Sequence, residues 1–275
     1  MKNSTDEEML ITSVHNPKVK QLLALQQKSS ERRKTGLFVV EGLRELTHCL
    51  EGGYEVESVF CCEEVMGDDA SLSGLPLEGA RRMSVSRVVY DRIAYRGSTE
   101  GVVAVIRSRK MSLTDLQLRT DSLIIVVESV EKPGNLGAIL RSADAAGADA
   151  LIVCDPLTDL FNPNLIRSSV GTAFTVPTVA CTSEECIAFL KDRGIKILTA
   201  QLQDSRLYYD TDMRKATAIV MGTEATGLTN SWRQAADAHI RIPMLGRIDS
   251  LNVSVSAAIL LFEAIRQRGG GIGSL

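Results

Sequence analysis

Three short segments of the sequence place polar side chains next to the glycines and prolines of tight turns. They cover residues 131–141, 222–227 and 241–252. Glycine lets the backbone turn sharply and approach a partner closely, and proline removes a backbone donor. Such segments suit a pocket that holds a polar ligand through backbone groups, while side chains bind an anion or stabilise developing charge.

The first segment, Glu-Lys-Pro-Gly-Asn-Leu-Gly-Ala-Ile-Leu-Arg, carries its chemistry at Asn135 and Arg141. Asn135 can cap the helix that follows, and an arginine near a helix start suits a phosphate. The two residues lie about one and a half turns apart, so they need not face the same way. Taken alone, the segment is explained more simply as a capped helix with a surface arginine.

The second segment, Gly-Thr-Glu-Ala-Thr-Gly, sets Glu224 between Gly222 and Gly227. A carboxylate in such a turn can accept hydrogen bonds or hold a cation, and a turn with a helix-capping acid is the plainer alternative. The third segment favours the functional interpretation. It forms an arch from Ile242 to Leu251, in which backbone groups are placed to hold the edge of a flat, polar ring.

A repeated strand-then-helix pattern must position these segments. It predicts a doubly wound parallel sheet, in which ligands bind at the carboxyl ends of the strands. The predicted strands are 123–127, 150–154, 175–179, 195–200, 216–221 and 239–242, and the predicted helices are 135–146, 164–170, 184–191, 230–236 and 253–267.

The first hundred residues predict a smaller α/β domain. Its strands are expected at 36–40, 56–60, 83–85 and 101–106, and its helices at 16–27, 41–50 and 87–94. A polar stretch without a strong period follows and predicts a linker. The expected organisation is an N-terminal domain at 1–108, a linker at 109–121, a C-terminal domain at 122–268 and a flexible tail at 269–275.

Composition limits the possible classes of protein. The 275 residues are 44% hydrophobic and only 4% aromatic, which suits an α/β protein whose core is built from aliphatic side chains. No apolar run approaches the roughly 18 residues of a membrane span. The opening residues, MKNSTDEEML, contain no apolar stretch typical of a signal peptide, so a cytoplasmic location is expected.

The six cysteines follow no paired C-x-x-C spacing, and Cys181 and Cys186 form a C-x4-C pair without a second pair. Neither a metal site nor a structural disulfide is therefore expected. Small hydrophobic roles in the core are the expected use of these residues.

The net charge of −3 gives no global argument for nucleic-acid binding, but the basic residues are unevenly spread. Residues 13–36 contain six basic side chains and one acid, and residues 81–110 contain eight basic side chains and two acids. Such stretches either track phosphates or form solvated faces, and composition alone does not decide between the two.

A nicotinamide oxidoreductase is a rival interpretation, because the first segment joins a strand to a helix and Asp155 follows the next strand. The G-x-G-x-x-G fingerprint is absent, since the glycines occur only as Gly134-x-x-Gly137. Without the middle glycine the signal for a dinucleotide fold is weak.

The order and spacing of the three segments resemble the three motifs of the SpoU (TrmH-like) branch of the SPOUT RNA methyltransferases. The matching patterns are Asn135-x-Gly137-x-x-x-Arg141, Gly222-x-Glu224-x-x-Gly227, and Ile242-Pro243-Met244 through Ser250-Leu251-Asn252. Residues 159–174 also resemble the family, although Thr172 stands where alanine often follows the glycine. The resemblance covers roughly residues 123–266. The segment Phe38–Gly42 is similar to a substrate-binding domain of many members, which resembles a small RNA-binding ribosomal protein.

The resemblance implies a homodimeric ribose 2′-O-methyltransferase that uses S-adenosylmethionine, acts on structured RNA and contains a trefoil knot. Ribosomal RNA is the expected substrate, with transfer RNA or a non-catalytic RNA-binding role as alternatives, and no metal is needed. The implied catalytic residues are Asn135, Arg141, Glu224 and Asn252, with Ser250 a lesser candidate. The implied cofactor-binding residues are Thr199, Ala200, Met221, Gly222, Ile242, Met244 and Leu251. The RNA-binding candidates are Lys18, Arg32, Arg33, Lys34 and Arg141.

Overall fold

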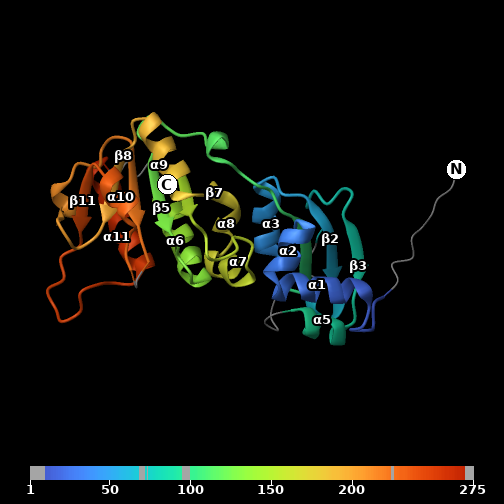
Figure 1. Ribbon diagram of the computed structural model, residues 1–275. Coiled ribbons are helices and arrows are strands. Elements are labelled where there is room, and N and C mark those ends of the chain that lie inside the picture. The colour runs from blue at the N-terminus through green and yellow to red at the C-terminus, as the bar shows by residue number, and fades with distance from the viewer. Residues whose placement is uncertain (1–9, 68–71, 73, 95–99, 224–225, 270–275) are drawn as a thin grey trace. The chain divides into compact units, whose positions relative to one another are not determined.

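The computed structural model describes residues 10–67, 72, 74–94, 100–223 and 226–269 (Figure 1). Contacts divide the chain into two units. The N-terminal unit contains Met1–Arg109 with Phe161–Ile166, and the C-terminal unit contains Lys110–Leu160 with Arg167–Leu275.

The N-terminal unit is built on a four-stranded mixed sheet in the order β1-β4-β2-β3. Strand β4 is antiparallel to both of its neighbours, and β2 and β3 are parallel. The strands are β1 (Leu37–Glu41), β2 (Val56–Cys61), β3 (Arg81–Ser84) and β4 (Val102–Arg107), and the helices are α1 (Pro17–Gln27), α2 (Ser29–Thr35), α3 (Leu43–Glu51), α4 (Glu63–Met66) and α5 (Arg87–Ile93). The predicted small α/β domain is confirmed, while α2 and α4 were not predicted.

One hydrophobic core joins the helices of this unit to its sheet. Val19, Leu22 and Leu25 project from α1 at helical spacing and are fully buried against residues of β1, β4 and α5. Helix α2 was not predicted because its sequence, Ser-Ser-Glu-Arg-Arg-Lys-Thr, has no apolar residue to give a period.

The C-terminal unit contains a seven-stranded sheet in the order β7-β6-β5-β10-β8-β11-β9, and every described pairing in it is parallel. This confirms the predicted parallel sheet. The strands are β5 (Leu123–Glu128), β6 (Ala150–Cys154), β7 (Thr178–Cys181), β8 (Lys196–Ala200), β9 (Arg206–Leu207), β10 (Thr217–Met221) and β11 (Ala238–Arg241). The two-residue strand β9 was not predicted.

Helices lie on both faces of this sheet. Helices α9 and α10 pack on the face that contains Ile124, Ile152 and Ala218, and α6 and α11 pack on the other. The helices of the C-terminal unit are α6 (Pro133–Ala145), α8 (Thr172–Thr175), α9 (Ser183–Asp192), α10 (Asn230–Ala235) and α11 (Val253–Gln267), with 3-10 turns η1 (Leu113–Asp115) and η2 (Tyr208–Asp210). Helix α7 (Pro163–Ser169) is divided between the units, because residues 163–166 belong to the N-terminal one. None of the helices among the described residues is long and apolar enough to cross a membrane.

The segment predicted as a linker packs on the C-terminal unit. Leu116 is buried in the α9–α10 core, with Met111, Leu113 and Leu118 against it. Arg119 then donates through Nε to Asp149 Oδ1 over 2.8 Å. The spacing of these apolar residues follows neither the helical nor the strand period, so the pattern did not reveal their burial.

The end of α11 returns to the starts of β5 and β10. Arg268 donates to the carbonyl oxygens of Met213 (2.9 Å) and Lys215 (2.8 Å), and also to that of Asp121. These bonds hold the last described helix beside strands that begin far earlier in the chain. Residues 270–275 of the predicted tail lie outside the described residues.

Candidate functional site

The carboxyl ends of three neighbouring strands bring the second and third segments together. Strand β8 lies between β10 and β11, with Val220 opposite Thr199 and Ile240 opposite Ala200. The three strands end close to these pairs, β10 at Met221, β8 at Ala200 and β11 at Arg241. Met221 is buried and Ala200 is half-buried at this edge. The parallel topology therefore groups the predicted cofactor-binding residues of three distant segments.

The third segment forms one wall of a cavity of about 460 Å³. Of the seven cofactor-binding candidates, only Ile242 and Met244 are among its lining residues. The other lining residues are Leu202, Leu207, Arg241, Pro243, Gly246, Arg247, Ile248 and Asp249. Leu251 is half-buried just before the final helix. The hydroxyl of Thr199, by contrast, is fully buried and lies 2.6 Å from His239 Nδ1, so this side chain is not offered to a ligand.

Gly222 lies where two parts of the second segment approach each other closely. A Cβ atom at this position would fall 2.3 Å from the carbonyl carbon of Gly227, a distance that no side chain tolerates. Gly227 donates its N–H to the carbonyl of Thr223 over 3.0 Å and adopts a positive φ of 68°. Both glycines of the second segment are thus required by the backbone. Glu224, between them, lies outside the described residues.

Asn135 and Asn252 meet across the site. Asn252 caps α11, because its Oδ1 accepts from the N–H of Ser254 over 3.0 Å. Its Nδ2 donates to Oδ1 of Asn135, in the first turn of α6, over 3.2 Å. The first and third segments therefore join through their two asparagines. Ser250, the lesser candidate, is exposed and donates to Asp249.

Arg141 lies on α6, six residues beyond Asn135 and so about 9 Å further along the helix axis. Its side chain is exposed to solvent. An exposed guanidinium can form paired hydrogen bonds with an anion such as a phosphate.

A buried carboxylate network supports the same edge of the sheet and was missed by the sequence analysis. Glu128, the last residue of β5, is 2% exposed and accepts from the N–H of Thr229 (2.8 Å) and from its hydroxyl (2.7 Å). Ser183, at the start of α9, donates its hydroxyl proton to Asp155 Oδ2 over 2.6 Å, with Glu128 Oε1 3.1 Å from the same oxygen, and accepts from Trp232 Nε1. The sequence feature that could have revealed this network is an acidic residue at the end of an otherwise apolar strand, because a buried carboxylate needs hydrogen-bond partners.

This network also weakens the dinucleotide interpretation. The carboxylate of Asp155 accepts from the Ser183 N–H over 3.2 Å and from its hydroxyl over 2.6 Å. Oδ2 of Asp155 is therefore engaged at the start of α9, so this oxygen is not available to a ribose.

The RNA-binding candidates of the N-terminal unit separate into two kinds. Arg33 and Lys34 are exposed in the last turn of α2, and Lys18 is half-buried on α1. Arg32, by contrast, is only 5% exposed and donates through Nη1 to the carbonyl oxygens of Leu25 (2.5 Å) and Gln26 (3.3 Å). The prediction for Arg32 is wrong, because its guanidinium satisfies the carbonyls at the end of α1.

The second basic stretch is partly neutralised in space. Arg81 and Arg107 both pair with Glu57, and Arg87 pairs with Asp91 over 2.8 Å. The sequence placed Glu57 outside the stretch, so the count of basic residues overestimated the local positive charge.

Comparison with known proteins gives two family matches. Residues 122–262 match the SpoU rRNA Methylase family, and residues 16–104 match the MRM3-like substrate binding domain. The two matches lie on either side of residues 105–121.

Individual relatives match over almost the full length. The chain is 32% identical to the 23S rRNA (uridine(2479)-2′-O)-methyltransferase of Streptomyces viridochromogenes, over 95% of this chain and 93% of the relative. It is 29% identical to the 23S rRNA (guanosine(2553)-2′-O)-methyltransferase RlmP of Bacillus subtilis (strain 168), over 92% and 98%. The AdoMet-bound rRNA methyltransferase of Sinorhizobium meliloti superposes with a TM-score of 0.84 and is 31% identical, covering 94% of this chain and 97% of that structure.

Proposed function

This chain belongs to the SpoU rRNA methylase family, and we propose that it transfers a methyl group from S-adenosylmethionine to a ribose 2′-hydroxyl of ribosomal RNA. The observation that carries the proposal is the hydrogen bond between Asn135 and Asn252, beside the strand ends where the cofactor segments gather. The two relatives compared above act on a uridine and a guanosine of 23S rRNA. We therefore assign the ribose as the target and leave the base unassigned.

The residues at the strand ends fit S-adenosylmethionine. The cavity walled by Ile242 and Met244 has a volume suited to a small cofactor, and apolar residues line it together with the charged side chains of Arg241, Arg247 and Asp249. Gly222 packs directly against the backbone of Gly227, which fixes the turn that follows β10 beside the other cofactor segments. Thr199, Ala200, Met221 and Leu251 complete the proposed set, with Thr199 contributing through its backbone.

Methyl transfer requires the protein to position the reacting groups and to stabilise the negative charge that develops on the ribose oxygen. S-adenosylmethionine supplies an electrophilic methyl group when it is bound. Arg141 is assigned to bind the phosphate next to the target ribose and to stabilise the oxyanion that develops as the hydroxyl loses its proton to solvent. A guanidinium keeps its own proton at neutral pH, so we do not assign Arg141 as the base.

Asn135, Glu224 and Asn252 are assigned to position Arg141 and the ribose. The bond between the two asparagines fixes the first turn of α6 relative to the start of α11. This fixed geometry reduces the rotational freedom of the groups that meet the substrate, which is a main source of rate in a transfer between bound partners.

RNA selection is assigned to the N-terminal domain, residues 1–108, joined through residues 109–121 to the methyltransferase domain at 122–268. The family match to a substrate binding domain at residues 16–104 supports this division. The exposed cations Arg33 and Lys34, with Lys18 and Arg141, are proposed to contact phosphates.

We include a homodimer, a trefoil knot and a cytoplasmic location in the proposal. Val255 and Phe262 are 47% and 49% exposed on α11 and lie seven residues apart, so they form one outward apolar face suited to a second copy. Support for the knot comes from β10, which lies between β5 and β8, and from the return of α11 to the start of β5. The absence of a membrane-spanning helix among the described residues is compatible with the cytoplasm.

Two measurements test the proposed function. Calorimetric titration with S-adenosylhomocysteine should give saturable binding that is lost when Gly222 is replaced. Incubation of unmodified ribosomal and transfer RNA with labelled S-adenosylmethionine should label a ribose of ribosomal RNA. Labelling of transfer RNA alone would change the substrate, and cofactor binding without any transfer would favour a non-catalytic RNA-binding protein.

A further inference from the structure

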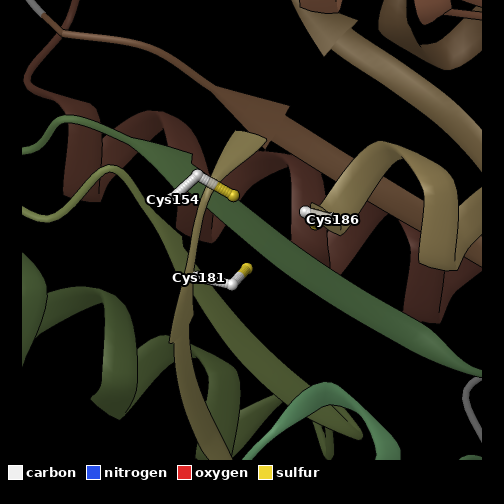
Figure 2. A group of neighbouring side chains, drawn as sticks. All are labelled: Cys154, Cys181 and Cys186. Atoms are coloured by element: carbon white, nitrogen blue, oxygen red, sulfur yellow. The ribbon is translucent and has the colours of Figure 1, made fainter. Parts of the chain in front are cut away.

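Three cysteines from three separate elements converge at one edge of the C-terminal sheet. Cys154 is the last residue of β6, Cys181 is the last residue of β7, and Cys186 lies in the first half of α9. Their sulfur atoms all lie within 4.8 Å of one another, and all three thiols are free. Figure 2 labels the three residues on their elements. We propose that this cluster binds a thiophilic metal ion, Zn²⁺ in the first instance, through three thiolates.

The fold itself brings the first two sulfurs together. Cys154 and Cys181 are register partners on adjacent parallel strands. Side chains at paired positions of neighbouring strands point to the same face of the sheet. Helix α9 covers that face and contributes Cys186, as Figure 2 shows. The three residues are therefore held by backbone hydrogen bonds and helix packing before any ion arrives.

The spacing suits coordination. A Zn–S bond of about 2.3 Å in tetrahedral geometry places two sulfurs about 3.8 Å apart. The sulfur atoms are at most 4.8 Å apart, so each must move by well under the length of a bond to reach this spacing. A small rotation about χ1 of a cysteine provides such a movement. A disulfide would use only two of the three sulfurs, whereas a metal ion uses all of them.

Burial leaves one side of the cluster open. Cys154 and Cys186 are fully buried within the α9–α10 core, and Cys181 is only partly buried. An ion can thus enter beside Cys181, and a water or an external ligand can fill the fourth position. Asp155 follows Cys154 in the sequence, and Glu185 precedes Cys186. The carboxylates of these two residues add negative charge that favours a cation.

Spacing along the chain gave no sign of this site. The distances in sequence between Cys154, Cys181 and Cys186 match no familiar zinc motif, so the sequence predicted no metal. The site is separate from the proposed methyl transfer, which needs no metal. Its expected role is structural, because it joins β6 and β7 to the helix whose Ser183 bonds Glu128 and Asp155.

The test uses the reduced, metal-free full-length protein under anaerobic conditions, with Co²⁺ as the spectroscopic probe. Equimolar Co²⁺ should give the charge-transfer and intense d–d bands of tetrahedral thiolate coordination, and Zn²⁺ should displace it. Cys181→Ser should remove these bands, whereas Cys61→Ser, a partly buried cysteine outside the cluster, should keep them. Bands that survive in Cys181→Ser, or a weak octahedral spectrum in the wild type, would overturn the proposal.

A second measurement uses only the wild-type protein, so its result does not depend on whether a variant folds. Alkylation of the native protein, read by peptide mass spectrometry, should modify Cys181 in the metal-free form and spare it after equimolar Zn²⁺, with Cys61 unaffected by the metal. The thermal midpoint should also rise with Zn²⁺, because an ion that binds only the folded state stabilises it. Equal alkylation of Cys181 with and without Zn²⁺ would show that the cluster is only a packing arrangement.

Discussion

Asn252 donates a hydrogen bond from Nδ2 to Oδ1 of Asn135 over 3.2 Å, although the two lie 117 positions apart along the chain. The same Asn252 side chain accepts from the N–H of Ser254 through Oδ1 and so caps α11. One amide therefore performs two functions at once. It ends the arch of the third segment, and it ties the start of the last helix to the first turn of α6.

Replacing Asn252 can separate these two functions. Asn252→Ala removes both and should lower the free energy of unfolding by about 1 kcal/mol through the lost cap. Asn252→Ser keeps a capping oxygen but cannot reach Asn135, so its stability should remain near that of the wild type. Both variants should lose most methyl transfer to ribosomal RNA. Full activity in Asn252→Ser would show that the bond to Asn135 has no part in the reaction.

Replacing Arg141 should separate catalysis from cofactor binding. Arg141→Ala should reduce methyl transfer to near background, because the phosphate and the developing oxyanion lose their cation, while affinity for S-adenosylhomocysteine stays unchanged. Arg141→Lys is the matched control. It keeps the charge but not the planar pair of donors, and should retain part of the activity. An affinity that falls as steeply as turnover in Arg141→Ala would contradict the assignment.

Gly222→Ala should abolish cofactor binding. The new Cβ would lie 2.3 Å from the Gly227 carbonyl carbon, so the second segment must move away from the strand ends. Gly134→Ala is the control, since a Cβ there meets nothing within 4 Å and its φ is not positive. Calorimetry with S-adenosylhomocysteine and circular dichroism should show a folded Gly222→Ala protein without binding, and a Gly134→Ala protein like the wild type. Normal binding by Gly222→Ala would move the cofactor site elsewhere.

The ion pair between Arg119 and Asp149 should make stability depend on acid pH. Burial alone raises the pKa of Asp149, but hydrogen bonds from the Arg119 side chain and the Leu123 N–H outweigh it and hold the pKa below its ordinary value. Because the pKa of Asp149 is lower in the folded state, its ionised form stabilises the fold. This contribution to the free energy of unfolding is complete above the unfolded-state pKa of about 4 and disappears as pH falls through the folded-state pKa.

Asp149→Asn should therefore lower the free energy of unfolding at pH 7 by about 1–3 kcal/mol, and its difference from the wild type should shrink in acid. Asp192→Asn is the control, because that side chain is 83% exposed and its pair with Arg193 spans 3.9 Å. Urea unfolding at pH 7 and at successively lower pH measures both. A constant difference between wild type and Asp149→Asn at all pH values would exclude this ion pair as the cause.

Sequence alone predicted the fold better than it predicted the site. Strands such as β5 and β6 are uninterrupted apolar runs, and buried parallel strands have few other sequence solutions. Short elements such as α2 and β9 carry no periodic signal, so contacts with other parts of the chain decide them. The family resemblance assigned Asn135 and Asn252 to one site, but the hydrogen bond between them was not predicted.

Two features were beyond any pattern along the chain. Arg32 belongs to a run of basic residues, and only the end of α1 explains why its guanidinium is buried. Cys154 and Cys181 become neighbours through the pairing of β6 with β7, a register that the spacing of cysteines does not encode. In both cases a contact with the backbone of a different element determines where the side chain lies, and sequence periodicity does not reveal such contacts.

The three adjacent cations of α2 should respond differently to removal of charge. Arg33→Gln with Lys34→Gln removes two exposed charges, so binding to a ribosomal RNA fragment should weaken and the slope of log affinity against log salt should fall by up to about 2. Arg32→Gln should leave that slope unchanged and instead lower the free energy of unfolding by about 1–3 kcal/mol, because the carbonyls of Leu25 and Gln26 lose a charged donor. Filter binding across salt concentrations and urea unfolding measure the two effects. A reduced salt slope in Arg32→Gln at unchanged stability would return Arg32 to the RNA-binding surface, because a buried donor to the end of α1 cannot produce that result.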